Sequence, residues 1–306
     1  MQKTSKIFVA GHKGLVGSAI LRNLQNRGFT NIVTKTRAEL DLINSIEVER
    51  FFQIEKPEYV FDAAAKVGGI HSNNTYSGDF IYENLQIQNN LINFSAKHGV
   101  TRFLFLGSVC IYPKFASIPV HESSLLTGTL EPTNEAYAIA KIAGIKMCQA
   151  YYKQYGFSSV SIMPANLYGP NDNFDPLNGH VIPAMLVKFN AQPKKVTLWG
   201  DGSAYREFLY VDDMADACIF LMEHPHLGKA EIVNAGLGYD ITIADLAQQI
   251  STLTNFQGEI YWDTDKPNGT PRRLLDSTYI NSLGWQPKYT LDQGLAETYA
   301  WIKRKQ

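Results

Sequence analysis

Short apolar runs alternate with longer segments of helical periodicity along the first half of the chain. The run Ile7-Phe8-Val9-Ala10 is apolar at every position, which is typical of a strand buried on both faces of a sheet. The same alternation predicts strands over 6–10, 31–34, 59–61, 102–106 and 160–163, and helices over 14–26, 45–55, 80–98 and 135–155. Strands that alternate with helices indicate an α/β fold with a doubly wound parallel sheet of the Rossmann-like type.

The sequence changes character after position 165. The segment 166–179 is rich in Asn, Pro, Gly and Asp, which is typical of a loop or hinge. Beyond it the pattern predicts helices over 181–190 and 213–223, strands over 195–199 and 230–234, and a smaller mixed α/β lobe from 243 onward. We therefore predict a nucleotide-binding domain at 1–165, rejoined by about 211–236, and a substrate-binding lobe formed by 166–210 and 237–306.

Composition narrows the class of protein. The chain has 306 residues, of which 45% are hydrophobic and 19% charged, as expected for a soluble protein with a sizeable core. Its formal net charge of -1 gives no reason to expect nucleic acid or an anionic membrane as a partner. No apolar run approaches the roughly 18 residues of a membrane span. Cys110, Cys148 and Cys218 lack the spacing of a disulfide framework or a metal site, so the cytoplasm is the expected compartment.

A glycine-rich turn follows the first predicted strand. Glycines at this place permit a tight turn and a close approach of the backbone to a dinucleotide, while the start of the next helix attracts the pyrophosphate. Without further evidence the turn could also be an ordinary one. The residues that we expect at the cofactor are those of the turn itself: Gly11, His12, Lys13, Gly14, Leu15, Val16 and Gly17.

Cations stand where an NAD site would place an acid. Such a site has an Asp or Glu about 20 residues after the turn, which binds the ribose hydroxyls. Here the end of the second strand carries Lys35 and Arg37, with no acid until Glu39, and Lys13 adds a positive charge within the turn. Cations favour the extra 2′-phosphate of NADP through charge-assisted hydrogen bonds. The pattern predicts NADP(H) as cofactor, unless Lys35 and Arg37 are merely surface charges.

A Tyr and a Lys four residues apart lie in the predicted helix 135–155. Tyr137 and Lys141 should share one face of that helix, and the ammonium should lower the pKa of the phenol. A phenol tuned in this way can exchange a proton with a carbinol oxygen near neutral pH. Ser108 follows the strand predicted at 102–106, at the sheet edge where open α/β folds bind ligands. Its hydroxyl could bond a substrate oxygen beside Tyr137.

Longer motifs resemble those of a known family. The chain resembles the extended short-chain dehydrogenase/reductases that modify nucleotide sugars, and within them the GDP-L-fucose synthases, which are 3,5-epimerase-4-reductases of GDP-4-keto-6-deoxy-D-mannose. The resemblance covers essentially the whole chain. Its motifs are Gly11-His12-Lys13-Gly14, Ala63-Ala64-Ala65-Lys66-Val67-Gly68-Gly69-Ile70, Asn73-Asn74-Thr75-Tyr76, Cys110-Ile111-Tyr112-Pro113-Lys114, Gly128-Thr129-Leu130-Glu131-Pro132-Thr133-Asn134-Glu135, Asn166-Leu167-Tyr168-Gly169-Pro170 and Arg206-Glu207-Phe208.

The resemblance implies roles for individual residues. Ser108, Tyr137 and Lys141 match the reductase triad, with Tyr137 as proton donor to the C4 oxygen, and Cys110 and His180 match the base and acid of the epimerase half-reaction. The family also forms homodimers, which implies that helices 80–98 and 135–155 pair across a dimer interface. Implied contacts with NADP(H) are at Leu106, Gly107, Lys141, Pro164, Ala165, Asn166, Leu167 and His180, and those with the GDP-sugar are at Ser108, Lys188, Trp199 and Arg206.

Two positions depart from the family pattern. Lys13 replaces a frequent Arg, which weakens bidentate recognition of the 2′-phosphate but keeps the charge. Asn268 replaces the Asp of a Lys-Pro-Asp-Gly sequence, so no substrate contact is assigned there. Two matched positions keep a second interpretation. Arg206 is either a clamp for the substrate diphosphate or a partner of Glu207, and Trp199 either stacks on the guanine or belongs to the core.

The chemistry of epimerisation supports a role for a thiol and an imidazole. A C4 ketone acidifies the protons at C3 and C5, and inversion needs a base on one face and an acid on the other. Cys110 lies two residues beyond Ser108, so one strand end can present both to a sugar. His180 opens a helix, where the dipole should destabilise the imidazolium and make it the better donor. Cys110 could instead be a small buried hydrophobe, as we expect for Cys148 and Cys218.

The sequence predicts NADPH-dependent conversion of GDP-4-keto-6-deoxy-D-mannose to GDP-L-fucose and leaves three alternatives. One is GDP-L-colitose synthase, or another NADP-dependent epimerase-reductase of a 4-keto-deoxy nucleotide sugar. A second is an NAD-retaining 4-epimerase or 4,6-dehydratase, which the cations after the second strand disfavour. A third is a catalytically silent NADP-binding regulator. The presence of all five candidate catalytic side chains argues against it: Ser108, Cys110, Tyr137, Lys141 and His180.

Overall fold

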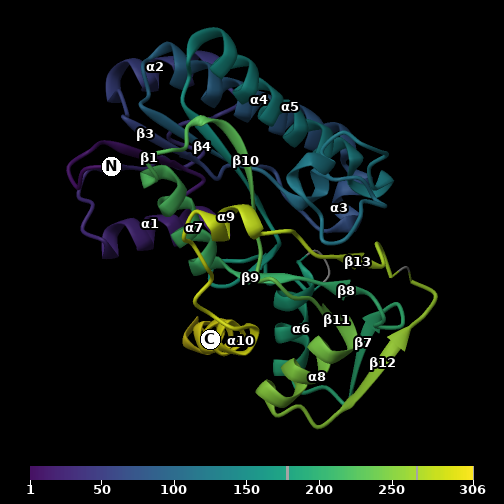
Figure 1. Ribbon diagram of the computed structural model, residues 1–306. Coiled ribbons are helices and arrows are strands. Elements are labelled where there is room, and N and C mark those ends of the chain that lie inside the picture. Colours follow the sequence, from purple (N-terminus) through teal and green to yellow (C-terminus); the bar gives the residue numbers. More distant parts are fainter. Residues whose placement is uncertain (177–178, 267, 306) are drawn as a thin grey trace.

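The centre of the molecule is a parallel sheet, seen in a computed structural model that describes residues 1–176, 179–266 and 268–305 (Figure 1). The six strands lie in the order β10-β5-β4-β3-β1-β2, and all neighbouring pairs are parallel. The predicted doubly wound α/β fold is therefore confirmed. The strands are β1 (Ile7–Ala10), β2 (Ile32–Val33), β3 (Tyr59–Asp62), β4 (Arg102–Leu106), β5 (Ser159–Pro164) and β10 (Lys229–Ala235).

Helices cover both faces of this sheet. The helices α2, α4 and α5 lie on one face, and α1 and α7 lie on the other (Figure 1). Strand β1 is completely buried between these layers, which is why its run is apolar at every position. The helices are α1 (Leu15–Asn26), α2 (Ser45–Glu55), α3 (Ile70–Thr75), α4 (Ser77–Lys97), α5 (Glu135–Tyr155) and α7 (Val211–Glu223).

The order of the strands reverses between β1 and β3. Strand β2 lies on one side of β1, whereas β3, β4 and β5 follow on the other side. At such a switch point the loops after the strands diverge and leave room for a ligand at the carboxyl edge of the sheet. The strand β10, which follows the intervening segment 166–210, pairs with β5 and completes this edge.

A second group of elements packs below the carboxyl edge of the sheet (Figure 1). It has a hydrophobic cluster of its own, with Phe189, Leu198 and Leu246 at its centre. The segment around Ile280 and Trp285 packs instead against the large cluster of the main sheet. The elements of this second group are β6 (Asn166–Tyr168), α6 (Val181–Asn190), β7 (Lys195–Trp199), β8 (Tyr205–Arg206), β9 (Phe208–Tyr210), β11 (Ile241–Thr242), α8 (Ile243–Thr254), β12 (Glu259–Asp263), β13 (Arg272–Arg273) and α10 (Leu291–Lys305). Helix α9 (Thr278–Ser282) lies against the main sheet. Short 3₁₀ turns are found at Val109–Ile111, Glu122–Ser124 and Pro132–Asn134.

The burial of the cysteines and the character of the helices can be compared with the sequence predictions. Cys148 and Cys218 are completely buried in α5 and α7, as predicted, and Cys110 is partly buried. Across the described residues, no helix combines the length and apolar character that crossing a membrane would take.

Candidate functional site

The glycine turn after β1 packs directly against the chain after β3. Gly11 has a φ of 75°, and a Cβ on it would lie 2.5 Å from the carbonyl oxygen of Ala63. A Cβ on Gly17 would lie 2.2 Å from the Gly11 carbonyl oxygen. The Gly14 amide donates to that same oxygen at 2.9 Å and opens α1 without a side-chain cap. The turn thus needs glycine sterically, and the amides at the start of α1 have no capping side chain in front of them, as pyrophosphate binding requires.

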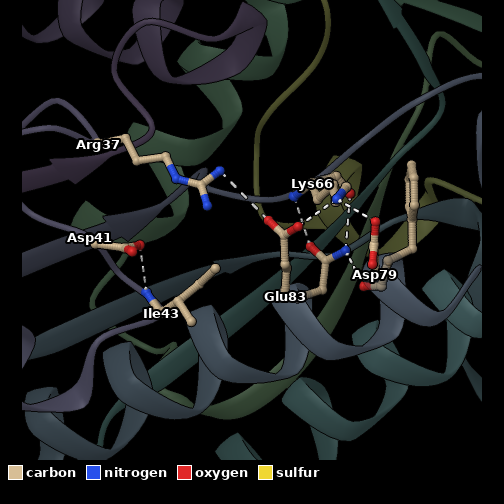
Figure 2. A network of polar contacts seen from close by, with 8 residues as sticks. Arg37, Asp41, Ile43, Lys66, Asp79 and Glu83 are labelled. Atoms are coloured by element: carbon tan, nitrogen blue, oxygen red, sulfur yellow. Dashed lines mark hydrogen bonds and ion pairs between the residues drawn. The ribbon is translucent and has the colours of Figure 1, made fainter. Parts of the chain in front are cut away.

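A pocket of about 340 Å³ opens beside this turn. Figure 2 shows Glu83, on α4, between two of the cations that line it. The Glu83 carboxylate lies 3.7 Å from Arg37 and 2.5 Å from Lys66, and Lys66 also pairs with Asp79 at 3.4 Å. The side chain of Asn84 holds the Lys66 backbone by accepting from its amide and donating to its carbonyl. The pocket is lined by Gly11, Gly14, Lys35, Arg37, Leu40, Asp41, Leu42, Ile43, Ala63, Ala64, Ala65, Lys66, Glu83 and Ile87.

The acid nearest to the end of β2 is already engaged. Both the amide and the hydroxyl of Thr36 donate to the Glu39 carboxylate at 2.7 Å, and these bonds lower the pKa of Glu39. Lys13 is exposed beside His12, whose pKa is lowered by burial and by the Lys13 charge. The mouth of the pocket therefore carries Lys35 and Arg37 as predicted, which suits a phosphate better than a ribose hydroxyl.

Ser108 and Cys110 lie together just beyond the carboxyl end of β4. The Ser108 hydroxyl accepts from the Cys110 amide at 3.3 Å and caps a 3₁₀ turn. The side-chain amide of Asn134, which immediately precedes α5, donates to the Cys110 sulfur at 3.2 Å. Burial raises the pKa of the thiol, while Ser108 and the positive charge of Arg273 act in the opposite direction. The thiol is thus influenced by Ser108 from its own turn and by two residues distant in sequence, Asn134 and Arg273.

Tyr137 and Lys141 share a face of α5, but their electrostatics differ from the prediction. Burial raises the pKa of Tyr137, the neighbouring Cys110 raises it further, and a hydrogen bond with Ser108 partly opposes both. The Lys141 ammonium donates to the carbonyl of Leu106 at 2.8 Å. Since it points to the strand, the expected lowering of the pKa of Tyr137 by Lys141 is wrong for this state of the protein. A phenol that keeps its proton at neutral pH is nevertheless what a proton donor requires.

His180 stands immediately before α6 and contacts Asp172. Its Nδ1 lies 3.4 Å from the carboxylate of Asp172, and this hydrogen bond raises the pKa of the imidazole. We expected the helix dipole to destabilise the imidazolium, and this prediction is wrong because the adjacent carboxylate outweighs the dipole. A protonated His180 is still a competent acid. Its side chain is 45% exposed, and no hydrogen bond recorded among the described residues joins it to Cys110.

The carboxyl ends of β4 and β5 lie side by side at the edge of the sheet. Leu106 ends β4, and the amide of Gly107 donates to the carbonyl of Ile162 on β5. A Cβ on Gly107 would lie 2.3 Å from the Met163 side chain, so the two strand ends pack closely. The remaining residues expected along the nicotinamide follow at the same edge: Pro164, Ala165, Asn166 and Leu167.

Two arginines lie side by side below this edge. Arg206 on β8 and Arg273 on β13 are directly opposite in a parallel ladder. Burial and their mutual repulsion lower the pKa of Arg206, and the charge of Arg273 also acts on Cys110. Arg206 donates to backbone carbonyls, and the buried Glu207 accepts from backbone amides, so these two residues do not form the pair considered above. Adjacent guanidinium groups are suited to a diphosphate.

The other predicted substrate residues lie on the surface of the second group of elements. Lys188 is half-buried near the end of α6, and burial lowers its pKa. Trp199 ends β7 with 51% of its surface exposed, so it is not a core residue. The side chain of Asn268 accepts from the Asp201 amide, and its carbonyl accepts from Arg206. Asn268 thus shapes the loop that holds Arg206.

The sequence alone did not identify the part that three residues play in the site. Arg273 becomes visible only through the pairing of β13 with β8, which joins segments 67 positions apart. Lys66 belongs to a recognised motif, but its pairing with Glu83 depends on the packing of α4 against the pocket. Asp62, at the end of β3, is buried near Lys141 inside an apolar run. An acid within such a run is the one signal that could have been noticed.

A doubly wound sheet with a glycine-rich turn after β1, and a helix that brings Tyr137 and Lys141 to the end of β4, defines a nucleotide-dependent short-chain dehydrogenase/reductase. Comparisons agree with this class. The sequence model of the NAD dependent epimerase/dehydratase family matches residues 7–236. The putative GDP-L-fucose synthase 2 of Arabidopsis thaliana is 58% identical over 305 residues, which cover 98% of this chain and 92% of that protein. The GDP-L-fucose synthase of Escherichia coli (strain K12) is 51% identical over 98% of this chain and 97% of its own length.

A solved structure agrees with these relatives. The GDP-mannoheptose C4 reductase from Campylobacter jejuni, with NADP bound, superposes with a TM-score of 0.91 at 38% identity and covers 99% of both chains. The chain therefore belongs to the NAD dependent epimerase/dehydratase family and, within it, to the GDP-L-fucose synthases.

Proposed function

We propose that the protein converts GDP-4-keto-6-deoxy-D-mannose to GDP-L-fucose by 3,5-epimerisation and NADPH-dependent 4-reduction. One observation carries the proposal. The thiol of Cys110 lies close enough to the phenol of Tyr137 to raise the pKa of that phenol, and Ser108 interacts with both side chains. A base for carbon acids and a proton donor for a carbinol oxygen are the two functions that this pair of half-reactions needs in one place.

The cofactor that we assign is NADP(H). The close packing of Gly11 and Gly17, the uncapped start of α1 and the cationic mouth of the adjacent pocket fit a dinucleotide with a 2′-phosphate. When bound, NADPH supplies the hydride for C4. Lys35 and Arg37 would hold the 2′-phosphate, with Lys13 nearby, and Pro164 to Leu167 would lie along the nicotinamide.

Epimerisation would use the thiol and the imidazole in turn. Cys110, as thiolate, would remove the proton from C3 or C5, and the C4 ketone would accept the charge as an enolate. The Arg273 charge and the Ser108 hydroxyl favour the thiolate against burial. His180, whose protonated form Asp172 stabilises, would return a proton on the opposite face. The sugar would bind between Cys110 and His180, so that each side chain reaches one face of its ring.

Reduction would use Tyr137. Its buried phenol keeps the proton that the C4 oxygen receives, and the Ser108 hydroxyl would orient that oxygen. The Lys141 ammonium, which donates to the Leu106 carbonyl, would contact the bound NADP(H), as the resemblance implies. The GDP diphosphate would bind Arg206 and Arg273, Trp199 would stack on the guanine, and Lys188 would contribute a further charge.

We also propose a homodimer in the cytoplasm. The outer faces of α4 and α5 expose Tyr82, Ile139 and Tyr155, and these helices pack against each other. Joining two such pairs would bury these side chains in a four-helix interface. Light scattering of the purified protein tests the dimer, and a monomeric mass at micromolar concentration would exclude it.

The substrate is tested against the nearest alternative. The proposal predicts that NADPH oxidation with GDP-4-keto-6-deoxymannose is faster than with its 3-deoxy analogue, which a GDP-L-colitose synthase would prefer. A faster reaction with the 3-deoxy analogue would assign colitose synthesis. NADPH binding without turnover of either sugar would favour a regulator that only binds the cofactor.

A further inference from the structure

Asp62 is a carboxylate in the centre of the fold. It ends β3, is 0% exposed, and its Oδ1 accepts from the Ala64 amide at 3.2 Å. Its Oδ2 has no hydrogen-bond partner within the described part of the chain. A buried carboxylate with one free oxygen is costly when ionised, so its charge depends on a nearby cation.

The register of the sheet brings that cation close. Asp62 lies directly opposite Phe105 on β4, and neighbouring strands are about 4.8 Å apart. The Lys141 ammonium lies 4.7 Å from the centroid of the Phe105 ring and donates to the carbonyl of the next residue, Leu106. Asp62 and Lys141 are therefore close neighbours, although no ion pair within 4.0 Å joins them among the described residues.

Other polar groups around Asp62 and Lys141 are neutral at pH 7. Opposite residues of a ladder share a face, so Ser161 on β5 lies on the same side as Phe105 and Asp62. From α5 the titratable neighbours are Tyr137 and Cys148, on whose pKa the Asp62 charge acts. Gln88 of α4 donates to the Ala140 carbonyl. Cys110 acts on Tyr137 from the 3₁₀ turn.

We propose that Asp62 is a positioning residue for the reductase, whose buried carboxylate keeps Lys141 protonated and Tyr137 in its proton-bearing form at neutral and mildly alkaline pH. Asp62 acts through Lys141 and Tyr137 and does not touch the substrate. The link to catalysis rests on the function proposed above, whereas the electrostatic coupling between Asp62 and Lys141 does not.

Loss of the Asp62 charge should lower the pKa of both Lys141 and Tyr137. Burial lowers the pKa of Lys141, and the Asp62 charge opposes this lowering. The same charge contributes to the raised pKa of Tyr137. Without the carboxylate, both groups should lose their protons at lower pH. The alkaline limb of the activity profile should therefore move to lower pH, whichever of the two groups controls it.

The first test follows Lys141 itself in the full-length protein with NADP⁺ bound. Lysines are labelled with ¹³C at Cε, the Lys141 signal is assigned by its loss in Lys141→Arg, and its shift is followed against pH. In Asp62→Asn, which keeps an oxygen acceptor for the Ala64 amide, the pKa of Lys141 should fall by about one unit. In Asp213→Asn, which neutralises another buried carboxylate on α7, it should not change. An unchanged pKa of Lys141 in Asp62→Asn would overturn the proposal.

The same NMR titration of the wild type tests the coupling between Asp62 and Lys141 even if Asp62→Asn does not fold. Burial raises the pKa of Asp62 to about 6, so the Lys141 signal should show a second inflection near that pH. A single inflection would count against the coupling.

The second test is the pH profile of kcat with saturating NADPH and GDP-4-keto-6-deoxymannose. The alkaline limb of Asp62→Asn should lie about one pH unit below that of the wild type, with similar rates near pH 6.5. An equal loss of rate at every pH would show a merely structural role and would overturn the proposal. If the wild type turns over no sugar, the proposed function fails, and the NMR titration still decides the coupling.

Discussion

The guanidinium of Arg37 lies 3.7 Å from the carboxylate of Glu83 (Figure 2). The ammonium of Lys66 contacts the same carboxylate at 2.5 Å, and all three side chains line the pocket. An acid thus competes with the cofactor for one of the cations that we assign to the 2′-phosphate. Glu83 also raises the pKa of Lys66 through their hydrogen bond. Cofactor preference should therefore depend on both partners of this contact.

Substitutions of Arg37 and Glu83 should change cofactor preference in opposite directions. Arg37→Ala should raise the KM for NADPH about tenfold or more and leave the KM for NADH nearly unchanged, because the 2′-phosphate loses a charge-assisted partner. Glu83→Gln should increase the preference for NADPH, because Arg37 no longer has a competing carboxylate. Steady-state kinetics with both cofactors measure this, with the exposed Arg50→Ala on α2 as control. Equal changes for NADPH and NADH would refute the assignment.

Tyr137→Phe should lower the rate of reduction by about 10²–10⁴-fold, the usual contribution of a positioned general acid. The buried phenol keeps its proton because desolvation raises its pKa. Exchange of the C3 and C5 protons with solvent should continue, since it uses other groups. Reduction at near wild-type rate would mean that another group donates the proton.

Cys110→Ser should abolish solvent exchange at C3 and C5, because a hydroxyl is too weakly acidic to act as the base. The measurement is deuterium incorporation in deuterated water with oxidised cofactor, so that reduction does not mask exchange. His180→Gln should retain some exchange without the L-sugar, because the acid alone is missing. Cys148→Ala, which alters a completely buried thiol of α5, is the control and should exchange as the wild type does. Wild-type exchange in Cys110→Ser would place the base elsewhere.

Asp62 should make the protein less stable as pH rises. Its pKa is raised to about 6 in the folded protein, above the value of 3.8 for a free side chain. Between these values the folded state holds the proton more tightly, so the free energy of unfolding falls as pH increases. The contribution is about 3 kcal/mol, fully present as a penalty above pH 6 and absent below pH 4. Urea unfolding of wild type and Asp62→Asn at several pH values should show this difference; parallel curves would contradict it.

The elements of the main sheet could be predicted because burial leaves a simple pattern. Strand β1 is apolar throughout, and β5 is buried throughout although it contains Ser159 and Ser161. The long helices α4 and α5 begin and end within three residues of the predicted limits. Strands of two or three residues, such as β8 and β13, are too short for any periodicity to appear. The division into two domains stays a prediction, which the second hydrophobic cluster supports.

The candidate site could be predicted only as far as local motifs reach. The motifs identified Cys110 and Tyr137, but the signs of two pKa shifts depended on partners distant in space. Burial dominates the pKa of Tyr137, and Asp172 reverses the expected shift of His180. Arg273 required the strand register of the folded chain. Residues that are brought together by strands far apart in the sequence have no characteristic spacing along the chain, so no sequence motif identifies them.

The most direct test of the central claim is the identity of the product. The purified protein is incubated with GDP-4-keto-6-deoxymannose and NADPH, and the sugar is analysed by ¹H NMR. Inversion at C3 and C5 together with reduction at C4 should yield GDP-L-fucose with one NADPH consumed per sugar. A 6-deoxyhexose reduced at C4 but still of the D configuration, or no consumption of NADPH, would contradict the account.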